Sequence, residues 1–321
     1  MTFLAILLGS LSYAMLNVGM GLQKKGAAEL PEIEDQGFFK NLKNFLTNKF
    51  WLIGFLLVNL QWIAFSIAVD IGDLSIVTPM MGVGLIVLVL FSVFYLKEKI
   101  TVKEIIAIVV IIIGVVILGA TSANATIEYT IEDINNLLLT KGAIIFLICA
   151  TVLMILLVVF SIIRKFALAD IMFGIAAGIA SGIGVIFTKG FMGGLDLGNL
   201  WLSLKTSVVL WEWWLYLGLL ITYNLISTVF PQIGFQKVKA VVVTPLFAIA
   251  ALITPIFGGI IIFSEWVNIL PGNLVAKIIA LVLILVGVSL LSLYSTRSKS
   301  GVETVEKSEE VLEENEDSGE N

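Results

Sequence analysis

The sequence contains no histidine and a single cysteine, and these absences exclude several kinds of site. A histidine proton relay, a histidine-ligated metal and a Ser-His-Asp triad all require the missing imidazole. Cys149 stands alone in an apolar run, so the chain can form neither an intrachain disulfide nor a cysteine zinc site. We therefore expect no enzymatic activity and no resident cofactor.

Charge is also scarce. The 321 residues include 19 Lys and Arg and 24 Asp and Glu, or 13% of the chain, whereas soluble domains have about 25%. Hydrophobic residues make up 59%, and the mean hydropathy is +1.06. So few charges cannot cover the surface of a soluble fold of this size. The composition predicts an all-α polytopic membrane protein.

Nine apolar stretches are long enough to cross a hydrocarbon core of about 30 Å, which takes about 20 helical residues. They lie near 2–22, 50–70, 76–96, 103–121, 141–163, 170–190, 213–235, 242–263 and 274–294. An odd number of spans places the termini on opposite faces. The face opposite the C-terminus holds four of the 19 basic residues, Lys141, Lys189, Lys205 and Lys277. This bias predicts a plasma-membrane protein with its N-terminus outside and its C-terminus in the cytoplasm.

The chain repeats itself at offsets of about 165 residues. Three pairs of matching segments are QKKG at 23–26 with FTKG at 187–190, IVTPMMG at 76–82 with VVTPLFA at 242–248, and FYLKEK at 94–99 with IIFSEW at 261–266. We infer a four-helix repeat in 1–140, a linker span in 141–169 and a second four-helix repeat in 170–296. One linker span inverts the second repeat, giving an inverted 4+1+4 arrangement that is typical of transporters with alternating access.

Two further segments have distinct compositions. Residues 38–50 place Phe and Leu on one helical face, which predicts an interfacial amphipathic helix on the inner side. Residues 297–321 are Glu-rich and without aromatic residues, which predicts a disordered acidic cytoplasmic tail.

The chain resembles the drug/metabolite transporter superfamily, which includes the EamA-like transporters. The resemblance rests on a Gly-rich first span, a Pro-bearing third span that ends in FYLKEK or FSEW, and a Gly-bearing fourth span. With LQKKG after the first span and SIVTPMMGVG in the third, it is most similar to the NIPA-type magnesium transporters. The resemblance implies transport of Mg²⁺ or another divalent cation. Small multidrug transporters have an acidic residue in their first span, and this chain has none there.

Polar groups and prolines within the spans are the candidates for a substrate path. They are Asn17, Asn59, Gln61, Thr78, Pro79, Asn224, Thr244 and Pro245. The amides offer neutral oxygens to a cation, and a Thr-Pro pair frees a backbone carbonyl inside a helix. The alternative is structural, with amides in hydrogen bonds between helices and prolines at packing kinks.

Carboxylates and lysines at the span ends have alternative roles as well. Asp70 and Asp73 lie at the predicted outer mouth, where they would capture a cation, although Asp73 is also placed to cap the third span. Glu98, beside a Thr101–Glu104 capping box, is interpreted as structural, and so is Glu265 on the opposite side. Lys25 and Lys189 are expected to extend toward the membrane interface, and the alternative is that they screen against anions.

These features predict a membrane transporter that moves Mg²⁺ or another divalent cation inward by alternating access. The alternative is an EamA-like exporter of small metabolites or drugs. The expected partners are the transported ion or small solute and the lipid bilayer, without nucleic acid. The metal ligands are not identified by the sequence, and a homodimer is left open.

Overall fold

The computed structural model describes residues 1–30, 38–95, 100–121, 129–164, 169–196, 198–237, 240–267 and 269–317, and every element in these ranges is helical. The long helices are α1 (Thr2–Ala28), α3 (Lys49–Ile71), α5 (Met81–Phe94), α6 (Val102–Thr121), α8 (Lys141–Ile163), α9 (Ala169–Met192), α11 (Trp211–Lys237), α12 (Ala240–Ile261) and α13 (Pro271–Asp317). Eight helical segments of the described part are long and apolar enough to cross a membrane, and α12 supplies a shorter apolar stretch, Leu246–Ile261. The chain is therefore a polytopic membrane protein, as predicted.

The third span is a broken helix. It begins with α4 (Leu74–Val77), tightens into a 3₁₀ turn, η2 (Thr78–Met80), and continues as α5. Pro79 has no N–H to donate one turn back, and the Thr78 hydroxyl donates to the Leu74 carbonyl oxygen at 2.6 Å. The predicted Thr-Pro irregularity is thus present in the first half of the chain.

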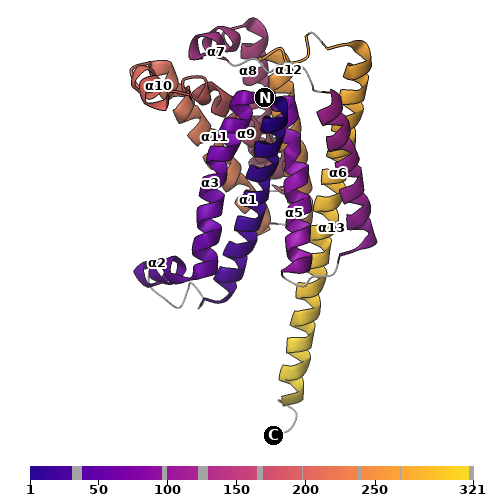
Figure 1. The fold of residues 1–321 in the computed structure, drawn as a ribbon. Helices are drawn as coiled ribbons and strands as arrows, with labels where there is room; N and C mark the ends of the chain where they lie inside the picture. Colours follow the sequence, from indigo (N-terminus) through magenta and orange to yellow (C-terminus); the bar gives the residue numbers. More distant parts are fainter. Residues whose placement is uncertain are drawn as a thin grey trace.

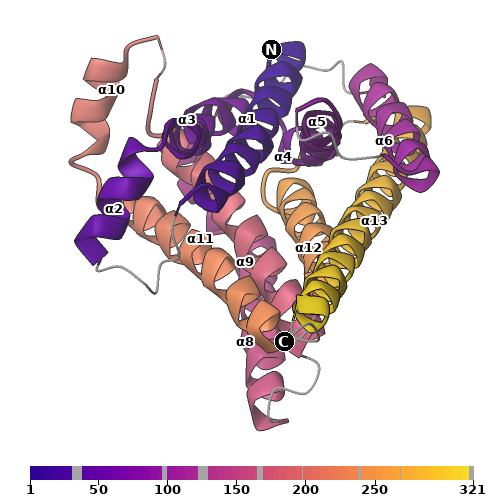
Figure 2. The ribbon, with the colours of Figure 1, turned by 90° about the horizontal axis from the view of Figure 1, so that it is seen from below.

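The helices fall into two groups of four spans that pack in similar ways, and we call these groups the first and second quartets. In the first quartet, α1 packs against α3 and α5; in the second, α9 packs against α11 and α12. The linker helix α8 packs on α9. Helices α6 and α13 pack along each other at one edge of the molecule, which joins the quartets (Figure 2).

Corresponding helices of the two quartets run in opposite directions. Ala5, near the start of α1, lies beside Gly72, because a Cβ atom added to Gly72 would fall 2.5 Å from the Ala5 Cβ atom. Lys189, near the end of α9, donates a hydrogen bond to the carbonyl oxygen of the same Gly72. The start of α1 and the end of α9 therefore share one end of the molecule, and the chain termini lie at opposite ends (Figure 1).

Three short helices lie outside the spans. Helix α2 (Phe38–Thr47) covers most of the predicted 38–50 segment, but it stops at Asn48, whose side chain accepts from the Trp51 N–H at 3.0 Å and caps α3. At the opposite end lie α7 (Ile131–Leu138), with a Thr130–Asp133 capping box, and α10 (Leu200–Ser207) (Figure 1). Neither α7 nor α10 was predicted, since each is too short for a span.

Helix α13 continues from the last span into the predicted acidic tail. The backbone stays helical to Asp317 and extends beyond the other helices, where the composition predicted disorder (Figure 1). The physical reason is that a span already supplies the helix nucleus, so propagation adds one hydrogen bond for each residue fixed. Glu, which accounts for seven of the residues in 302–317, also has high helix propensity.

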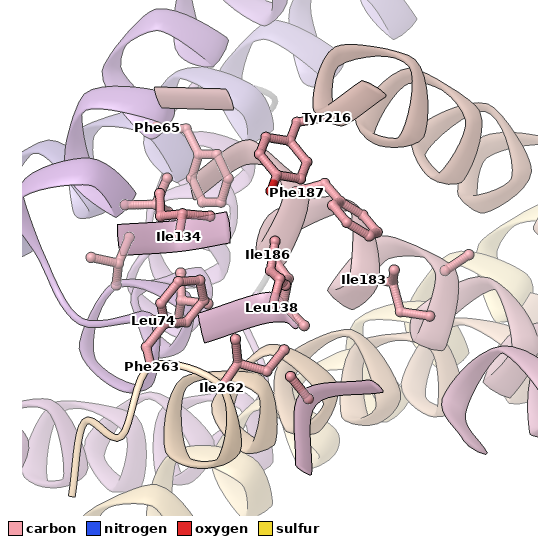
Figure 3. Packing of buried hydrophobic residues seen from close by; sticks show 14 of the residues in the cluster. Phe65, Leu74, Ile134, Leu138, Ile183, Ile186, Phe187, Tyr216, Ile262 and Phe263 are labelled. Atoms are coloured by element: carbon pink, nitrogen blue, oxygen red, sulfur yellow. The ribbon is translucent and has the colours of Figure 1, made fainter. Parts of the chain in front are cut away.

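The larger core cluster lies where the quartets meet. It joins Phe65 and Leu74 of the first quartet to Ile183, Ile186 and further side chains of the second (Figure 3). Helix α7 contributes the buried side chains of Ile134 and Leu138 to this cluster and therefore packs against the membrane spans. The packing places the ends of α3, α9 and α12 close together, and that junction contains the charged residues described next.

Candidate functional site

Four ionisable side chains from both quartets gather at this junction, and we call them the ionic cluster: Asp73, Lys189, Glu265 and Lys277. Asp73 lies between α3 and α4, Lys189 in the last turns of α9, Glu265 in the turn after α12, and Lys277 near the start of α13. The two lysines are 2% exposed, and the two carboxylates are half-buried. Two positive and two negative groups balance each other when all four are ionised.

Glu265 caps a helix of the other quartet. Its carboxylate oxygens accept hydrogen bonds from the backbone N–H groups of Leu74, at 2.6 Å, and Ser75, at 3.0 Å. These N–H groups open the third span and have no partner within it, so a negative charge is favourable there. Burial raises the pKa of Glu265, against the lowering effect of the nearby Lys189 ammonium group.

The turn that carries Glu265 is shaped for this contact. Ser264 has a φ of 51°, in the left-handed region that a side chain seldom adopts. This conformation turns the chain back, and the Glu265 N–H donates to the Gly259 carbonyl oxygen at 3.1 Å. A Cβ atom at Gly259 would lie 2.3 Å from a Glu265 carboxylate oxygen, so only glycine leaves room for this carboxylate.

Lys189 forms a second connection between the quartets. Its Nζ atom donates to the Gly72 carbonyl oxygen at 2.7 Å and lies 5.4 Å and 5.2 Å from the ring centroids of Tyr129 and Phe263. The expected extension to the membrane interface is therefore wrong for Lys189. A backbone carbonyl, two ring faces and neighbouring carboxylates stabilise the ammonium group inside the protein.

Asp73 occupies the N-cap position of α4, but its side chain makes no capping hydrogen bond. The predicted capping role thus belongs to Glu265 instead. Burial raises the pKa of Asp73, while the Lys189 and Lys277 ammonium groups act in the opposite direction. Asp70, the other predicted mouth carboxylate, lies in the last turn of α3 and contributes to the field at Lys189.

Aromatic groups surround the cluster. The Tyr129 hydroxyl donates to the Phe263 carbonyl oxygen at 2.9 Å, and burial together with the charges of Glu265 and Asp73 raises the pKa of Tyr129 to about 12. The Trp266 indole N–H donates to the Ser75 hydroxyl oxygen at 3.2 Å, and the Lys277 Nζ atom lies 5.7 Å from the Trp266 ring centroid. The Trp266 contact is one more connection between the quartets.

The predicted path amides bond within their own helices. Asn17 donates to the Tyr13 carbonyl oxygen at 2.8 Å, Asn59 to Phe55 at 2.7 Å and Asn224 to Leu220 at 2.8 Å. The expected hydrogen bonds between helices are therefore replaced by contacts one turn back. In each case one N–H of the side-chain amide makes this hydrogen bond.

The structure separates these three amides. Asn17 is 5% exposed and its amide nitrogen lies against Gly84 of α5, whereas Asn59 faces outward. Asn224 lies against Gly184 of α9 and is half-buried. Asn59 is therefore the least suited of the three amides to line an internal path.

The remaining predicted positions differ in burial and in whether their side chains are described. Gln61 and Thr78 are buried, and Pro79 lies in the 3₁₀ turn that contacts α12 of the second quartet. The backbone of 244–245 is part of helix α12, but the side chains of Thr244 and Pro245 lie outside the described part of the chain, as does Glu98. The Thr101–Glu104 capping box is confirmed, with Glu104 accepting from the Thr101 N–H at 2.7 Å.

Among the described residues, no three His, Cys, Asp or Glu side chains come together in a way that could hold a metal ion.

Buried charges at a junction of inverted helices are typical of transporters. Residues 2–297 match the family described as Magnesium transporter NIPA. This chain belongs to the NIPA magnesium transporter family. A relative from Arabidopsis thaliana, "Probable magnesium transporter NIPA9", is 26% identical over 286 residues, which cover 86% of this chain and 78% of the relative. No solved structure matches the chain.

Membership of the NIPA family confirms the resemblance drawn from the sequence motifs. The sequence missed the partnership of Lys189 with the first quartet and the role of Lys277. A signal for the first was available: Lys25 and Lys189, and Glu98 and Glu265, recur at offsets of 164 and 167 residues. This recurrence marks Lys189 and Glu265 as positions with equivalents in the first repeat.

Proposed function

We propose that this protein carries Mg²⁺ inward across the plasma membrane by alternating access between the two quartets. The observation that carries the proposal is the family match over residues 2–297, supported by the named activity of the relative. The antiparallel course of α1 and α9 agrees with this mechanism, because inverted quartets can exchange one open end for the other. In this orientation the N-terminus and the ionic cluster face outside, and the acidic C-terminal segment faces the cytoplasm.

The outer carboxylates supply the first contact with the ion. Asp70 and Asp73 lie at the mouth, and Mg²⁺ commonly binds one or two carboxylates while it keeps several waters. An inside-negative potential then favours uptake, since two charges moving through about 100 mV gain about 4.6 kcal/mol. Uptake driven in this way needs no coupled proton.

The path continues between the quartets along the broken third span. Thr78 and Pro79 lie one turn below the capped start of α4, and η2 contacts both α12 and α13 of the second quartet. A carbonyl that a proline leaves unbonded is a suitable oxygen for a partly hydrated cation. Asn17, Gln61 and Asn224 would offer further neutral oxygens, with Thr244 and Pro245 as the equivalents of the Thr-Pro pair.

Ion flux into proteoliposomes with an inside-negative potential tests the proposal. We expect electrogenic Mg²⁺ uptake that falls roughly fivefold in Asp73→Asn, since one unit charge at close range is worth about 1 kcal/mol even in water. Asp70→Asn should also reduce uptake. Asp133→Asn is the matched control, because Asp133 is an exposed carboxylate at the same end that caps its own helix. Absence of Mg²⁺ flux together with transport of an organic solute would instead support the metabolite or drug exporter.

A further inference from the structure

Among the described residues, the equivalent lysines of the two repeats make different contacts at the two ends of the molecule. Lys189 crosses to the first quartet, at Gly72. Its repeat equivalent, Lys25, donates to the Tyr95 hydroxyl at 3.2 Å and lies 4.2 Å from the Phe50 ring centroid, and both partners belong to its own quartet. The two equivalent lysines therefore make different contacts: Lys189 binds the other quartet, and Lys25 binds its own.

Alternating access requires such a difference, because an outward-closed state must hold its outer end together while the inner end is free to separate. Four contacts hold the outer end: Glu265 to the N–H groups of Leu74 and Ser75, Lys189 to the carbonyl oxygen of Gly72, and Trp266 to the hydroxyl of Ser75. All four involve the short segment 72–75 at the start of the third span. The broken helix that this segment begins is thereby fixed against the second quartet.

We propose that Glu265 and Lys189 are the gating residues of the transport cycle and form a latch that closes the outer end over the Thr78–Pro79 break. The latch is defined by the four contacts above. This inference rests on the proposed transport function, because a gate has a role only in a protein that moves something. It adds to that function two residues that act by closing the path rather than by binding the ion at the mouth.

The chemistry of the contacts suits a latch that opens. Each contact is polar and involves a group that water or a cation can also satisfy, so release of these four contacts exchanges one hydrogen-bond partner for another. The Glu265 carboxylate and the α4 N–H groups have complementary charges, which makes closure favourable when the site is empty. A divalent cation that draws Asp73 or Glu265 toward itself would compete directly with these N–H donors.

The accessibility of position 78 to a thiol reagent indicates whether the latch is closed. Thr78 is 2% exposed and lies one helical turn, about 6 Å, below the capped residues. In a background with Cys149→Ser, which removes the exposed native thiol, we would introduce Thr78→Cys. The full chain in lipid nanodiscs is then treated with a membrane-impermeant maleimide, which reaches both faces.

We expect Glu265→Ala to accelerate labelling at position 78 roughly tenfold, the factor that corresponds to about 1.4 kcal/mol of closing free energy. Glu265→Gln, which keeps the size of the side chain, should act in the same direction and covers the case in which the alanine variant does not fold. Asp133→Asn removes a carboxylate that caps its own helix at the same end, and it should leave the rate unchanged.

A second reporter separates gating from a general loss of packing. Ser161 is fully buried in the linker helix α8, away from segment 72–75, so Ser161→Cys should label equally slowly with and without Glu265→Ala. Equal labelling of position 78 in the parent and both Glu265 variants would overturn the latch, as would the same acceleration at positions 78 and 161. Labelling needs no Mg²⁺. If the Glu265 variants label faster at position 78 but the protein shows no Mg²⁺ flux, the latch is supported and only the proposed substrate is wrong.

Discussion

The Nζ atom of Lys189 donates a 2.7 Å hydrogen bond to the carbonyl oxygen of Gly72, which lies 117 residues earlier in the chain and in the other quartet. Two elements with no sequence proximity are joined by a buried ammonium group that also faces the carboxylates of Asp73 and Glu265. Burying a charge is unfavourable unless partners surround it, so this arrangement makes each member of the cluster depend on the others.

The first prediction concerns this dependence. Lys189→Met keeps the length of the side chain but removes its charge, which leaves the carboxylates of Glu265 and Asp73 without their closest counter-ion. We expect a loss of about 3 kcal/mol in the free energy of unfolding, as is typical when one partner of a buried pair is removed. Chemical unfolding in detergent micelles measures it.

Two controls sharpen the Lys189 experiment. Lys205→Met, on the exposed surface of α10, should change the free energy of unfolding by less than about 0.5 kcal/mol. The double variant Lys189→Met/Glu265→Gln should recover part of the loss, because both charges are then absent. Strictly additive effects of the two substitutions would show that the residues are not coupled.

The second prediction is a pH dependence of stability. Burial raises the pKa of Glu265 above its ordinary 4.5 and that of Asp73 above 3.8. Lys189, Lys277 and Tyr129 are the other titratable groups that face these carboxylates. Above these ordinary values the folded protein therefore holds more protons than the unfolded chain. The free energy of unfolding should fall as the pH rises through the raised pKa values, by up to about 1.4 kcal/mol per pH unit for one proton.

Unfolding measured from the ordinary pKa values of 3.8 and 4.5 upward to neutral pH checks this dependence. Glu265→Gln and Asp73→Asn should each flatten the curve, since each removes one titrating group. Tyr129, with a pKa of about 12, stays protonated throughout this range and should not contribute. A stability that rises with pH over the same window, as salt-bridged carboxylates of lowered pKa produce, would contradict the prediction.

How far the sequence could predict these features depends on whether the interaction is local. The nine spans and the Thr101–Glu104 box follow from patterns within one or two helical turns, and so does the break at Pro79. Glu265 as the cap of α4 could not be predicted in this way, since its partners lie about 190 residues away. Lys189 was misplaced for the same reason, because a lysine near a span end ordinarily reaches toward water and the Gly72 carbonyl is visible only in three dimensions.

The third prediction concerns the strained turn before Glu265. Ser264, at a φ of 51°, adopts a conformation that costs a residue with a side chain about 1–2 kcal/mol. Ser264→Gly should therefore raise the free energy of unfolding by about 0.5–1 kcal/mol, after allowance for the larger entropy of glycine in the unfolded chain. Ser264→Val should lower it. As a reference, Ser203→Gly within helix α10 should destabilise by about 0.5–1 kcal/mol, and a loss of the same size at position 264 would argue against the strain.

The last prediction separates the position of the Glu265 carboxylate from its charge. A methyl group at position 259 would lie 2.3 Å from a carboxylate oxygen of Glu265, too close to be accommodated unless the carboxylate moves off the N–H groups of Leu74 and Ser75. Gly259→Ala should consequently accelerate maleimide labelling of Thr78→Cys several-fold, even though every charge of the cluster remains, and lower the free energy of unfolding by about 1–3 kcal/mol. Gly218→Ala in α11 is the matched control, because nothing lies within 4 Å of the added methyl group and alanine should stabilise the helix by up to about 1 kcal/mol. If Gly259→Ala labels as slowly as Gly218→Ala, closure of the outer end does not depend on where the Glu265 carboxylate lies, and the latch must be held by Lys189 and Trp266 alone.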